Sequence, residues 1–340
     1  MELKTKARYF SEENEIVVCT LCPHECRLKP GATGFCRVRE NNTGQLITSV
    51  YGIVSSEAWD PIEKKPLYHF FPGRPIFSIG SLGCNLHCKF CQNWQISQSS
   101  AKSFSYYRRE TPDQIVAKAL SDDRNIGIAY TYNEPTVWYE FMLDTAKLAR
   151  EKGLKNVVVS NGYINPEPLR ELIQYIDAFS IDLKAFTDRY YRKLLGGKLT
   201  PVLDAIKIIH DSGKHIEITN LIVPDENDQI DEIVRMVRWI SNELGRDTVL
   251  HISRYFPAWK WSSPPTEPET LYMALDIATQ MLDWVYLGNI ASDRGRDTYC
   301  PDCRELLIKR IGYHTEISGL TESGDCVYCG RHILDHVSLK

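Results

Sequence analysis

Residues 75–91 read PIFSIGSLGCNLHCKFC, a short apolar run followed by glycines and three closely spaced cysteines. The run Pro75–Ile79 contains isoleucine and phenylalanine and predicts a β-strand. Cys84, Cys88 and Cys91 follow it with the spacing C-x3-C-x2-C. Three thiolates on one loop can converge on an iron–sulfur cubane and leave one iron open, as catalytic metal sites do. A zinc loop or unrelated thiols are the alternatives.

Downstream of this loop, β-rich runs alternate with helical patterns for about 210 residues. The predicted strands are Ile126–Thr131, Asn156–Ser160, Ala178–Leu183, His215–Val223, Val249–Tyr255 and Trp284–Leu287. The predicted helices are Thr111–Leu120, Thr136–Lys152, Pro166–Tyr175, Pro201–Asp211, Ile230–Leu244 and Glu267–Leu282. Such alternation predicts βαβ units and a parallel sheet covered by helices. Ligands of parallel sheets bind at the carboxyl ends of the strands, where the cysteine loop lies.

Composition and charge narrow the class of protein. The chain has 340 residues, 43% of them hydrophobic, and a net charge of −4, so no overall charge favours nucleic acid. Residues 1–18 have no apolar core of a secretory signal, and no stretch approaches the ~18 apolar residues of a membrane span. We therefore expect a cytoplasmic protein without a membrane span and without a nucleic-acid partner. In that compartment the 11 cysteines are expected to bind metals or react rather than form disulfides.

Two further groups of cysteines lie near the ends of the chain. Cys300, Cys303, Cys326 and Cys329 form two C-x2-C knuckles, which is typical of a four-thiolate zinc site. Rubredoxin-like iron would use the same ligands, and we favour zinc.

Near the N-terminus, four cysteines lie within 18 residues: Cys19, Cys22, Cys26 and Cys36. Zinc and an auxiliary [4Fe–4S] cluster are both chemically reasonable there. We favour a closed structural metal site, and it stays open whether all, some or none of these four cysteines bind a metal.

The glycine-flanked cysteine loop resembles the signature of the radical S-adenosylmethionine (SAM) superfamily. The resemblance implies a partial (β/α)6 TIM-like barrel and a [4Fe–4S] cluster at Cys84, Cys88 and Cys91. It also implies that the open iron chelates the amino and carboxylate groups of SAM, and that SAM cleavage yields a 5′-deoxyadenosyl radical. A low-potential electron donor of the flavodoxin or ferredoxin type is implied as a partner.

The polar residues that follow the next strands are candidates for SAM binding. Glu134, in TYNEPTVW at 131–138, could accept hydrogen bonds from the SAM ammonium, or could be an acid favoured at a helix N-terminus. Pyruvate formate-lyase activating enzymes carry a glycine pair where this chain has Asn-Glu-Pro. Ser160 and Asn161 resemble part of the Thr-Asn-Gly of those enzymes, which carry an aspartate where this chain has Val159.

Later strands offer four more candidates. Asp182-Leu183-Lys184 matches the Asp-Leu-Lys of the same activating enzymes. Asp182 and Lys184 would point to one side of the strand and could bind the SAM ribose and carboxylate, or form a structural ion pair. His251 and Arg254, in HISRYFP at 251–257, are further candidates.

Similarity along the whole chain is greatest to the radical SAM enzymes of the AmmeMemoRadiSam system, a group related to pyruvate formate-lyase activating enzymes. The stretches that carry it are CTLCPHECRLKPGATGFCRVREN (19–41), DPIEKKPLYHF (60–70), CNLHCKFCQNWQIS (84–97), TYNEPTVW (131–138), HISRYFP (251–257) and YLGNI (286–290). We predict an N-terminal cysteine-rich segment (1–73), a radical SAM barrel (74–292) and a C-terminal zinc-ribbon or rubredoxin-like domain (293–340).

Three functions are compatible with this sequence. We favour a radical SAM oxidoreductase that takes hydrogen from a small molecule or lipid, because metal-binding segments accompany the barrel. A glycyl-radical-enzyme activase acting on a partner protein is the second, on the strength of Asp182-Leu183-Lys184. The third is a non-catalytic binding module whose fold is stabilised by bound metal ions.

Overall fold

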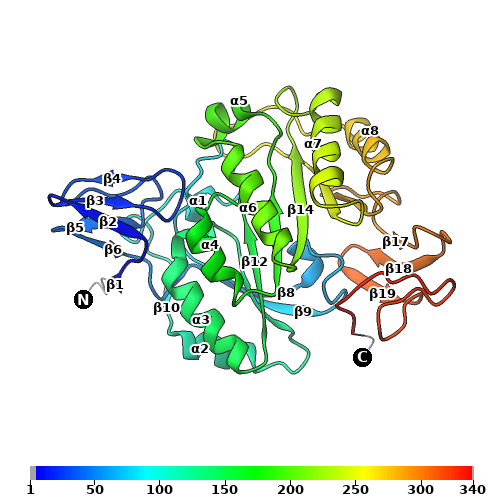
Figure 1. The fold of residues 1–340 in the computed structure, drawn as a ribbon, viewed down its shortest axis with the longest axis horizontal. Coiled ribbons are helices and arrows are strands. Elements are labelled where there is room, and N and C mark those ends of the chain that lie inside the picture. The colour runs from blue at the N-terminus through cyan, green and yellow to red at the C-terminus, as the bar shows by residue number, and fades with distance from the viewer. Residues whose placement is uncertain (1–4, 339–340) are drawn as a thin grey trace.

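The structure, a computed structural model, describes residues 5–338, and the outermost residues of the predicted end segments, 1–4 and 339–340, lie outside the described part. Its centre is an eight-stranded sheet covered by helices on its outer face (Figure 1). From edge to edge the strands are β16 (Val285–Gly288), β15 (Val249–Arg254), β14 (His215–Ile222), β13 (Ala178–Asp182), β12 (Lys155–Ser160), β11 (Gly127–Tyr130), β9 (Pro75–Gly80) and β8 (Ser56–Pro61).

The predicted barrel-type parallel sheet is confirmed. All neighbours from β9 to β16 pair in parallel, and the predicted strand boundaries agree closely with the observed ones. The strand predicted at Trp284–Leu287 is β16, so the sheet has seven parallel strands, one more than a (β/α)6 barrel. In addition, β8 pairs antiparallel with β9. Because β16 and β8 are the two edges, the sheet remains open along one side.

Helices connect the parallel strands across the outer face (Figure 1). They are α2 (Pro112–Ala119), α3 (Tyr139–Glu151), α4 (Pro166–Ile173), α6 (Thr200–Asp211), α7 (Ile230–Glu243) and α8 (Pro268–Ala278). Prolines lie in the first turns of α2, α4, α6 and α8, where a missing N–H is tolerated. The predicted helix Thr136–Lys152 begins instead with the 3-10 turn η2 (Pro135–Trp138). Short turns complete this layer: α1 (Trp94–Ser97), α5 (Asp188–Tyr190) and η3 (Tyr191–Leu195).

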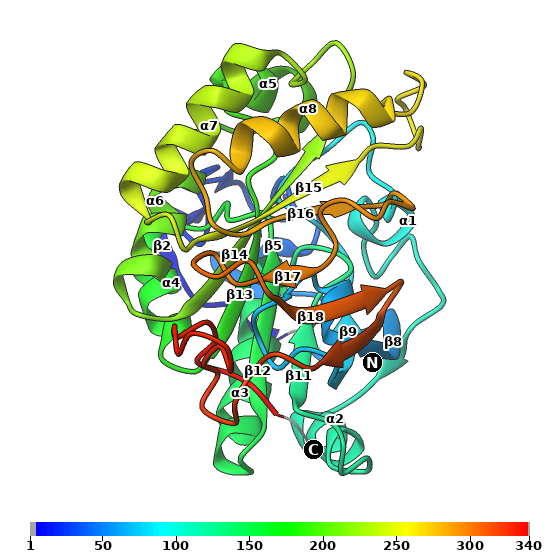
Figure 2. The same cartoon turned by 90° about the vertical axis from the view of Figure 1, so that its right-hand side faces the viewer.

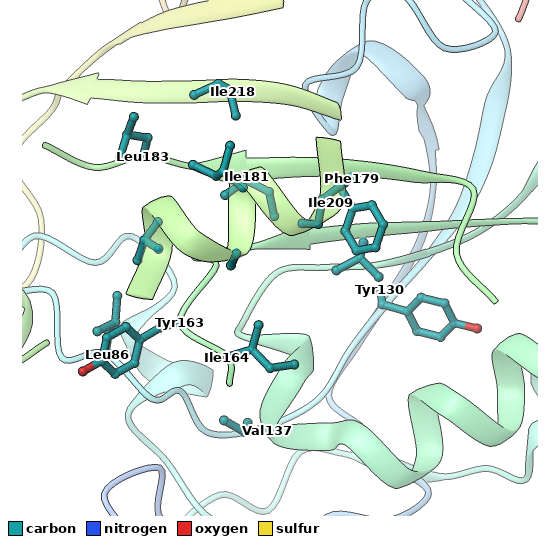
Figure 3. Packing of buried hydrophobic residues seen from close by; sticks show 14 of the residues in the cluster. Leu86, Tyr130, Val137, Tyr163, Ile164, Phe179, Ile181, Leu183, Ile209 and Ile218 are labelled. Atoms are coloured by element: carbon teal, nitrogen blue, oxygen red, sulfur yellow. The ribbon is translucent and has the colours of Figure 1, made fainter. Parts of the chain in front are cut away.

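Side chains alternate across the sheet and form two cores. Phe179 and Ile181 of β13 face outward and pack with Ile209 of α6 in the main hydrophobic cluster (Figure 3). Ala178 faces inward, where it contributes to a second, smaller cluster. Leu86 of the cysteine loop belongs to the main cluster, so the loop is anchored in the outer core.

The segment that follows β8 fills one end of the barrel interior. It begins with the 3-10 turn η1 (Ile62–Lys64), and its buried side chains Ile62, Leu67 and Phe70 form the inner cluster. Their partners include Ile76 and Ala178, which lie at the starts of their strands. The carboxyl ends of the strands, at the opposite end, are therefore left for ligands.

The two cysteine-rich ends lie on opposite sides of the barrel (Figure 1). The N-terminal part forms two small sheets from β1 (Thr5–Lys6), β6 (Gln45–Thr48) and β5 (Arg39–Asn42), and from β2 (Phe10–Glu13), β3 (Ile16–Cys19) and β4 (Arg27–Leu28). A further pair joins β7 (Ile53–Val54) to β10 (Arg108–Arg109). The C-terminal sheet consists of β17 (Thr298–Tyr299), β18 (Leu306–Ile311) and β19 (His314–Ile317).

Figure 2 shows this C-terminal sheet in front of the barrel, beside the edge strand β16. Within residues 5–338, no helix combines the length and the apolar character that crossing a lipid bilayer requires.

Candidate active site

The cysteine loop begins directly after β9 and is tied to three parts of the chain. Gly83 has a φ of +84°, and a Cβ there would lie 2.7 Å from the Cys36 carbonyl oxygen, so glycine allows the N-terminal segment to pack closely. The backbone N–H of Gly83 donates to the Ile96 carbonyl at 3.0 Å, and that of His87 donates to the Leu195 carbonyl at 2.7 Å. These bonds give the loop a fixed position.

Cys84, Cys88 and Cys91 are free thiols on this loop. The Cys84 sulfur accepts the backbone N–H of Leu86 at 3.3 Å, and the Cys91 sulfur lies 3.1 Å from the Ser97 hydroxyl. Burial raises the pKa of the Cys88 thiol to about 12 and the pKa of Cys84 well above its usual value. Three thiols of this kind are a donor set for an iron–sulfur cluster, whose positive iron would stabilise them as thiolates.

Glu134 joins the ends of β11 and β12. Its carboxylate accepts hydrogen bonds from the Ser160 hydroxyl at 2.8 Å, the Asn161 N–H at 2.8 Å and the Thr136 N–H at 3.0 Å. Burial raises the pKa of Glu134, although these hydrogen bonds lower it. Most of the carboxylate's capacity is therefore used within the chain, and Glu134 positions the loop that carries Ser160 and Asn161.

Asparagines connect these strand ends to the cysteine loop. The Asn161 amide donates to Asn85 Oδ1 at 2.9 Å and lies 3.7 Å from the Cys84 sulfur. Asn133 accepts the Ser81 N–H and donates to the Gly83 carbonyl, each at 2.9 Å. Asn85 and Asn133 were missed at the level of sequence because polar loop residues are common, although both lie in the stretches CNLHC and TYNEP.

The remaining candidates lie at the ends of β13 and β15. Lys184 Nζ is 2.8 Å from Asp182 Oδ2, so the two side chains form an ion pair on one side of the strand. Arg254 donates through Nε to the Thr266 carbonyl at 2.7 Å and lies over the Phe256 ring. The structure thus brings Glu134, Ser160 and Asn161 into one network with Cys84, while Arg254 makes its contacts elsewhere.

A cavity of about 890 Å³ lies along the open side of the sheet. It is lined by Thr219 of β14, His251 and Ser253 of β15 and Gly288 of β16. Residues 310–313 and the side chains Glu63, Lys64, Pro66 and Tyr68 complete this part of the lining. Glu217 holds His251 in place, since its carboxylate accepts from His251 Nε2 at 2.6 Å. A volume of this size suits a small-molecule ligand.

The C-terminal cysteines form a compact group. The four sulfurs of Cys300, Cys303, Cys326 and Cys329 lie within 4.8 Å of one another, with 3.5 Å between Cys300 and Cys329 and 3.6 Å between Cys303 and Cys326. A tetrahedral ion with Zn–S bonds of about 2.3 Å places its sulfurs about 3.8 Å apart. The group could therefore hold a single metal ion.

The N-terminal cysteines Cys19, Cys22, Cys26 and Cys36 all line one small cavity beside Arg39. Within residues 5–338, the C-terminal group is the one set of cysteine, histidine or acidic side chains found close enough together to hold a metal ion.

This N-terminal part contacts the cysteine loop directly. The Phe35 ring stacks between His24 and His87, with ring centroids 4.0 and 3.8 Å away. His24 Nε2 lies 2.7 Å from the Asn85 carbonyl oxygen.

Comparisons with known proteins agree with this geometry. Residues 78–240 match the radical SAM superfamily. An uncharacterized protein of Methanocaldococcus jannaschii is 45% identical over 328 residues, which cover 96% of this chain and 97% of that protein. The pyruvate formate-lyase-activating enzyme of Clostridium pasteurianum is 24% identical over 168 residues, which cover 47% of this chain and 67% of that enzyme.

Among solved structures, a radical SAM methyltransferase from Sphaerobacter thermophilus has a TM-score of 0.50 and 15% identity, covering 64% of this chain and 67% of that one, which supports the fold. The matched residues 78–240 contain the cysteine loop and the strand ends that surround it. Residues 78–240 are therefore a radical SAM domain, and domains of this superfamily use a [4Fe–4S] cluster and SAM.

Proposed function

We propose that the protein cleaves SAM at a [4Fe–4S] cluster bound by Cys84, Cys88 and Cys91, and takes a hydrogen atom from a small molecule or lipid. When bound, the cluster gives one electron to SAM, which yields methionine and a 5′-deoxyadenosyl radical that becomes 5′-deoxyadenosine on taking the hydrogen. The observation that carries the proposal is the contact of Asn161 with Cys84, because it joins the thiol loop to the strand ends.

In this proposal the strand-end residues bind SAM. Asp182 and Lys184 would meet the ribose hydroxyls and the carboxylate of SAM, exchanging their mutual ion pair for charge-assisted bonds to the ligand. Ser160 and Asn161 would line the site next to the cysteine loop. Glu134 would offer the ammonium its remaining acceptor capacity, and Arg254 would lie at the rim.

A small-molecule substrate is favoured over a protein by the cavity of about 890 Å³ beside the barrel interior. A glycyl-radical-enzyme activase is the second candidate, and the 24% identity to the activating enzyme of Clostridium pasteurianum favours it. Anaerobic incubation with SAM and a candidate partner separates the two: a glycyl-radical EPR doublet on the partner would establish the activase.

The closer assignment, to the radical SAM enzymes of the AmmeMemoRadiSam system, is also a proposal, and the six stretches quoted above support it. We propose the same three-part organisation, with segments 1–73, 74–292 and 293–340. The electron donor would be a flavodoxin or ferredoxin.

We propose different metals for the two outer cysteine groups. The close sulfur spacing supports zinc at Cys300, Cys303, Cys326 and Cys329. At Cys19, Cys22, Cys26 and Cys36, which line one cavity, we propose an iron–sulfur cluster, because a cluster attaches its cysteines to separate iron atoms. Metal analysis should then give one zinc ion per chain, together with the iron and sulfide content of two iron–sulfur clusters.

EPR spectroscopy of the reduced, reconstituted protein tests the proposed SAM site. SAM should change the signal of a reduced [4Fe–4S] cluster by binding to its open iron. In the Asp182→Asn variant, the SAM concentration needed for that change should rise about tenfold, since a charge-assisted bond is lost. An unchanged signal in the parent protein would contradict the proposal.

A further inference from the structure

The cavity along the open side of the sheet is enclosed by three parts of the chain. Thr219, His251 and Gly288 line it from the strands, Glu63 and Tyr68 from the segment after β8, and Arg310 from β18. Figure 2 shows β18 and β19 beside the edge strand β16, so the C-terminal sheet covers this opening. A ligand in the cavity would contact all three parts.

Three residues of this lining have buried polar atoms without a hydrogen-bond partner. They are Arg310 Nε, Glu63 Oε2 and Thr219 Oγ1, and the three residues are 1%, 3% and 8% exposed. A buried polar atom without a partner is unfavourable by more than an ordinary hydrogen bond contributes. All three atoms belong to residues that line the cavity, so a polar ligand bound there could supply the missing partners.

Arg310 is the buried cation of this lining, to which Glu63, Lys64, Asp293 and Arg296 also contribute charges. Its guanidinium donates to the Thr298 hydroxyl at 2.8 Å and to the carbonyl oxygens of Tyr68 and Arg296 at 3.0 and 3.2 Å. It also lies over the Tyr68 ring, 4.2 Å from the centroid. Across residues 5–338 it makes no ion pair with a carboxylate, although Glu63 is near enough to be influenced by its charge. A buried guanidinium without a carboxylate partner favours the binding of an anion.

The cavity extends to the level of the sheet at which the proposed SAM site lies. Asp182, Thr219, His251 and Tyr286 are register partners on adjacent parallel strands, so their side chains project from the same face at one level. Asp182 belongs to the proposed SAM site, and Thr219 and His251 line the cavity. A ligand held at Arg310 could therefore extend toward the site of radical formation.

We propose that the substrate is a small organic anion whose carboxylate or phosphate group binds Arg310, while its hydroxyl or amino groups meet Glu63 and Thr219. This inference rests on the proposed function in one respect: the bound anion is a substrate only if the protein cleaves SAM. The binding of the anion itself is a property of the cavity, and its measurement does not require SAM cleavage.

Equilibrium dialysis of the full, metal-replete chain with radiolabelled inorganic phosphate and, separately, succinate tests the proposal. At least one probe should bind saturably at one site per chain. Preference for phosphate would indicate a phosphate ester, and preference for succinate a carboxylate. Binding of neither probe would overturn the proposal.

Two matched variants test the role of Arg310. Arg310→Gln should weaken binding of the preferred anion about tenfold or more, because a charge-assisted bond is lost. Lys309→Gln removes a charge from the exposed side of the same strand and should change binding by about twofold at most. Equal effects of the two variants would contradict a specific site.

Arg310→Lys and Thr219→Val supply the same test if Arg310→Gln does not fold. The lysine keeps the charge but not the planar fork, so binding should weaken while the zinc content stays at that of the parent protein. Parent-like affinity in both of these variants would overturn the proposal. Formation of 5′-deoxyadenosine, measured in the same samples, shows independently whether the proposed SAM reaction occurs.

Discussion

Asn161, at the end of β12, lies with its amide nitrogen 3.7 Å from the sulfur of Cys84, on the loop after β9. The same amide donates to Asn85 at 2.9 Å, and the Asn161 side-chain oxygen accepts the Tyr163 N–H at 2.8 Å. One side chain therefore connects the proposed cluster loop with the proposed SAM-binding loop. The arrangement makes the geometry of the two loops interdependent.

Replacing Asn161 with alanine should impair catalysis more than folding. The variant loses its bonds to Asn85 and Tyr163, and a loss of about 1.4 kcal/mol in positioning corresponds to a tenfold lower rate. We expect SAM cleavage to fall about tenfold while iron and sulfide content stay close to those of the parent protein. Asn165→Ala, which removes a bond to the Thr20 carbonyl, is the control and should retain the parent rate. Equal rates for both variants would contradict the positioning role.

Gly83→Ala should separate the N-terminal segment from the cysteine loop. The new Cβ would lie 2.7 Å from both the Cys36 carbonyl oxygen and Val38 Cγ1. Gly153→Ala is the matched control, because Gly153 has a φ of +80° but no atom within 4 Å of the Cβ position. The control should lose about 1 kcal/mol of unfolding free energy from backbone strain alone.

The Gly83 variant should lose more stability than this control and should also bind less iron after reconstitution. Chemical denaturation and iron analysis measure the two effects. Matching losses in the two variants would show that the packing of Cys36 on the loop is unimportant.

Cys303→Ser should remove the metal of the C-terminal group and destabilise the sheet that carries it. Structural zinc contributes several kcal/mol to folding, so the melting temperature should fall by on the order of 5 °C or more. Zinc analysis should show a loss of one zinc per chain, while SAM cleavage without substrate should continue. Iron in place of zinc in the parent protein would contradict the assignment of the metal.

His69 should make stability depend on pH. Burial lowers the pKa of His69 to about 3, with Arg310, His215 and His251 acting in the same direction and Glu217 against it. The unfolded chain, with a pKa near 6.5, therefore binds more protons between pH 6.5 and 3, and stability falls as the pH falls through that window. His69 accepts or donates one hydrogen bond at Tyr286, 2.7 Å away.

His69→Gln keeps a side chain that can hydrogen-bond and removes the titration. Between pH 6.5 and 5, where the native fold is most readily studied, its unfolding free energy should decline less than that of the parent protein, by up to about 1.4 kcal/mol per pH unit. Urea denaturation at several pH values gives these slopes. Parallel slopes would contradict a neutral, buried His69.

The sequence allowed the barrel strands and their order of appearance to be predicted, because runs such as Ile126–Thr131 combine β-branched residues with flanking turns. It did not reveal that the segment after β8 enters the barrel, where Leu67 and Phe70 are buried. Connecting segments usually run over the surface, and nothing local in DPIEKKPLYHF distinguishes this one.

The contacts between pairs of side chains in the candidate site could not be predicted from the sequence either. The position of Glu134 after a strand was predictable, but its bonds to Ser160 and Asn161 depend on the register of two strands. Arg310 appeared as one of 40 lysines and arginines, and only the fold shows that it is buried beside a cavity. The cysteine spacing, by contrast, is local and could be interpreted directly.

Formation of 5′-deoxyadenosine from SAM by the anaerobically reconstituted and chemically reduced protein tests the central proposal most directly. The parent protein should form it, and variants with alanine at Cys84, Cys88 or Cys91 should form none, because each thiol is a ligand of the proposed cluster. Product formation in these three variants, or its absence from a parent protein that contains the cluster, would contradict the proposal.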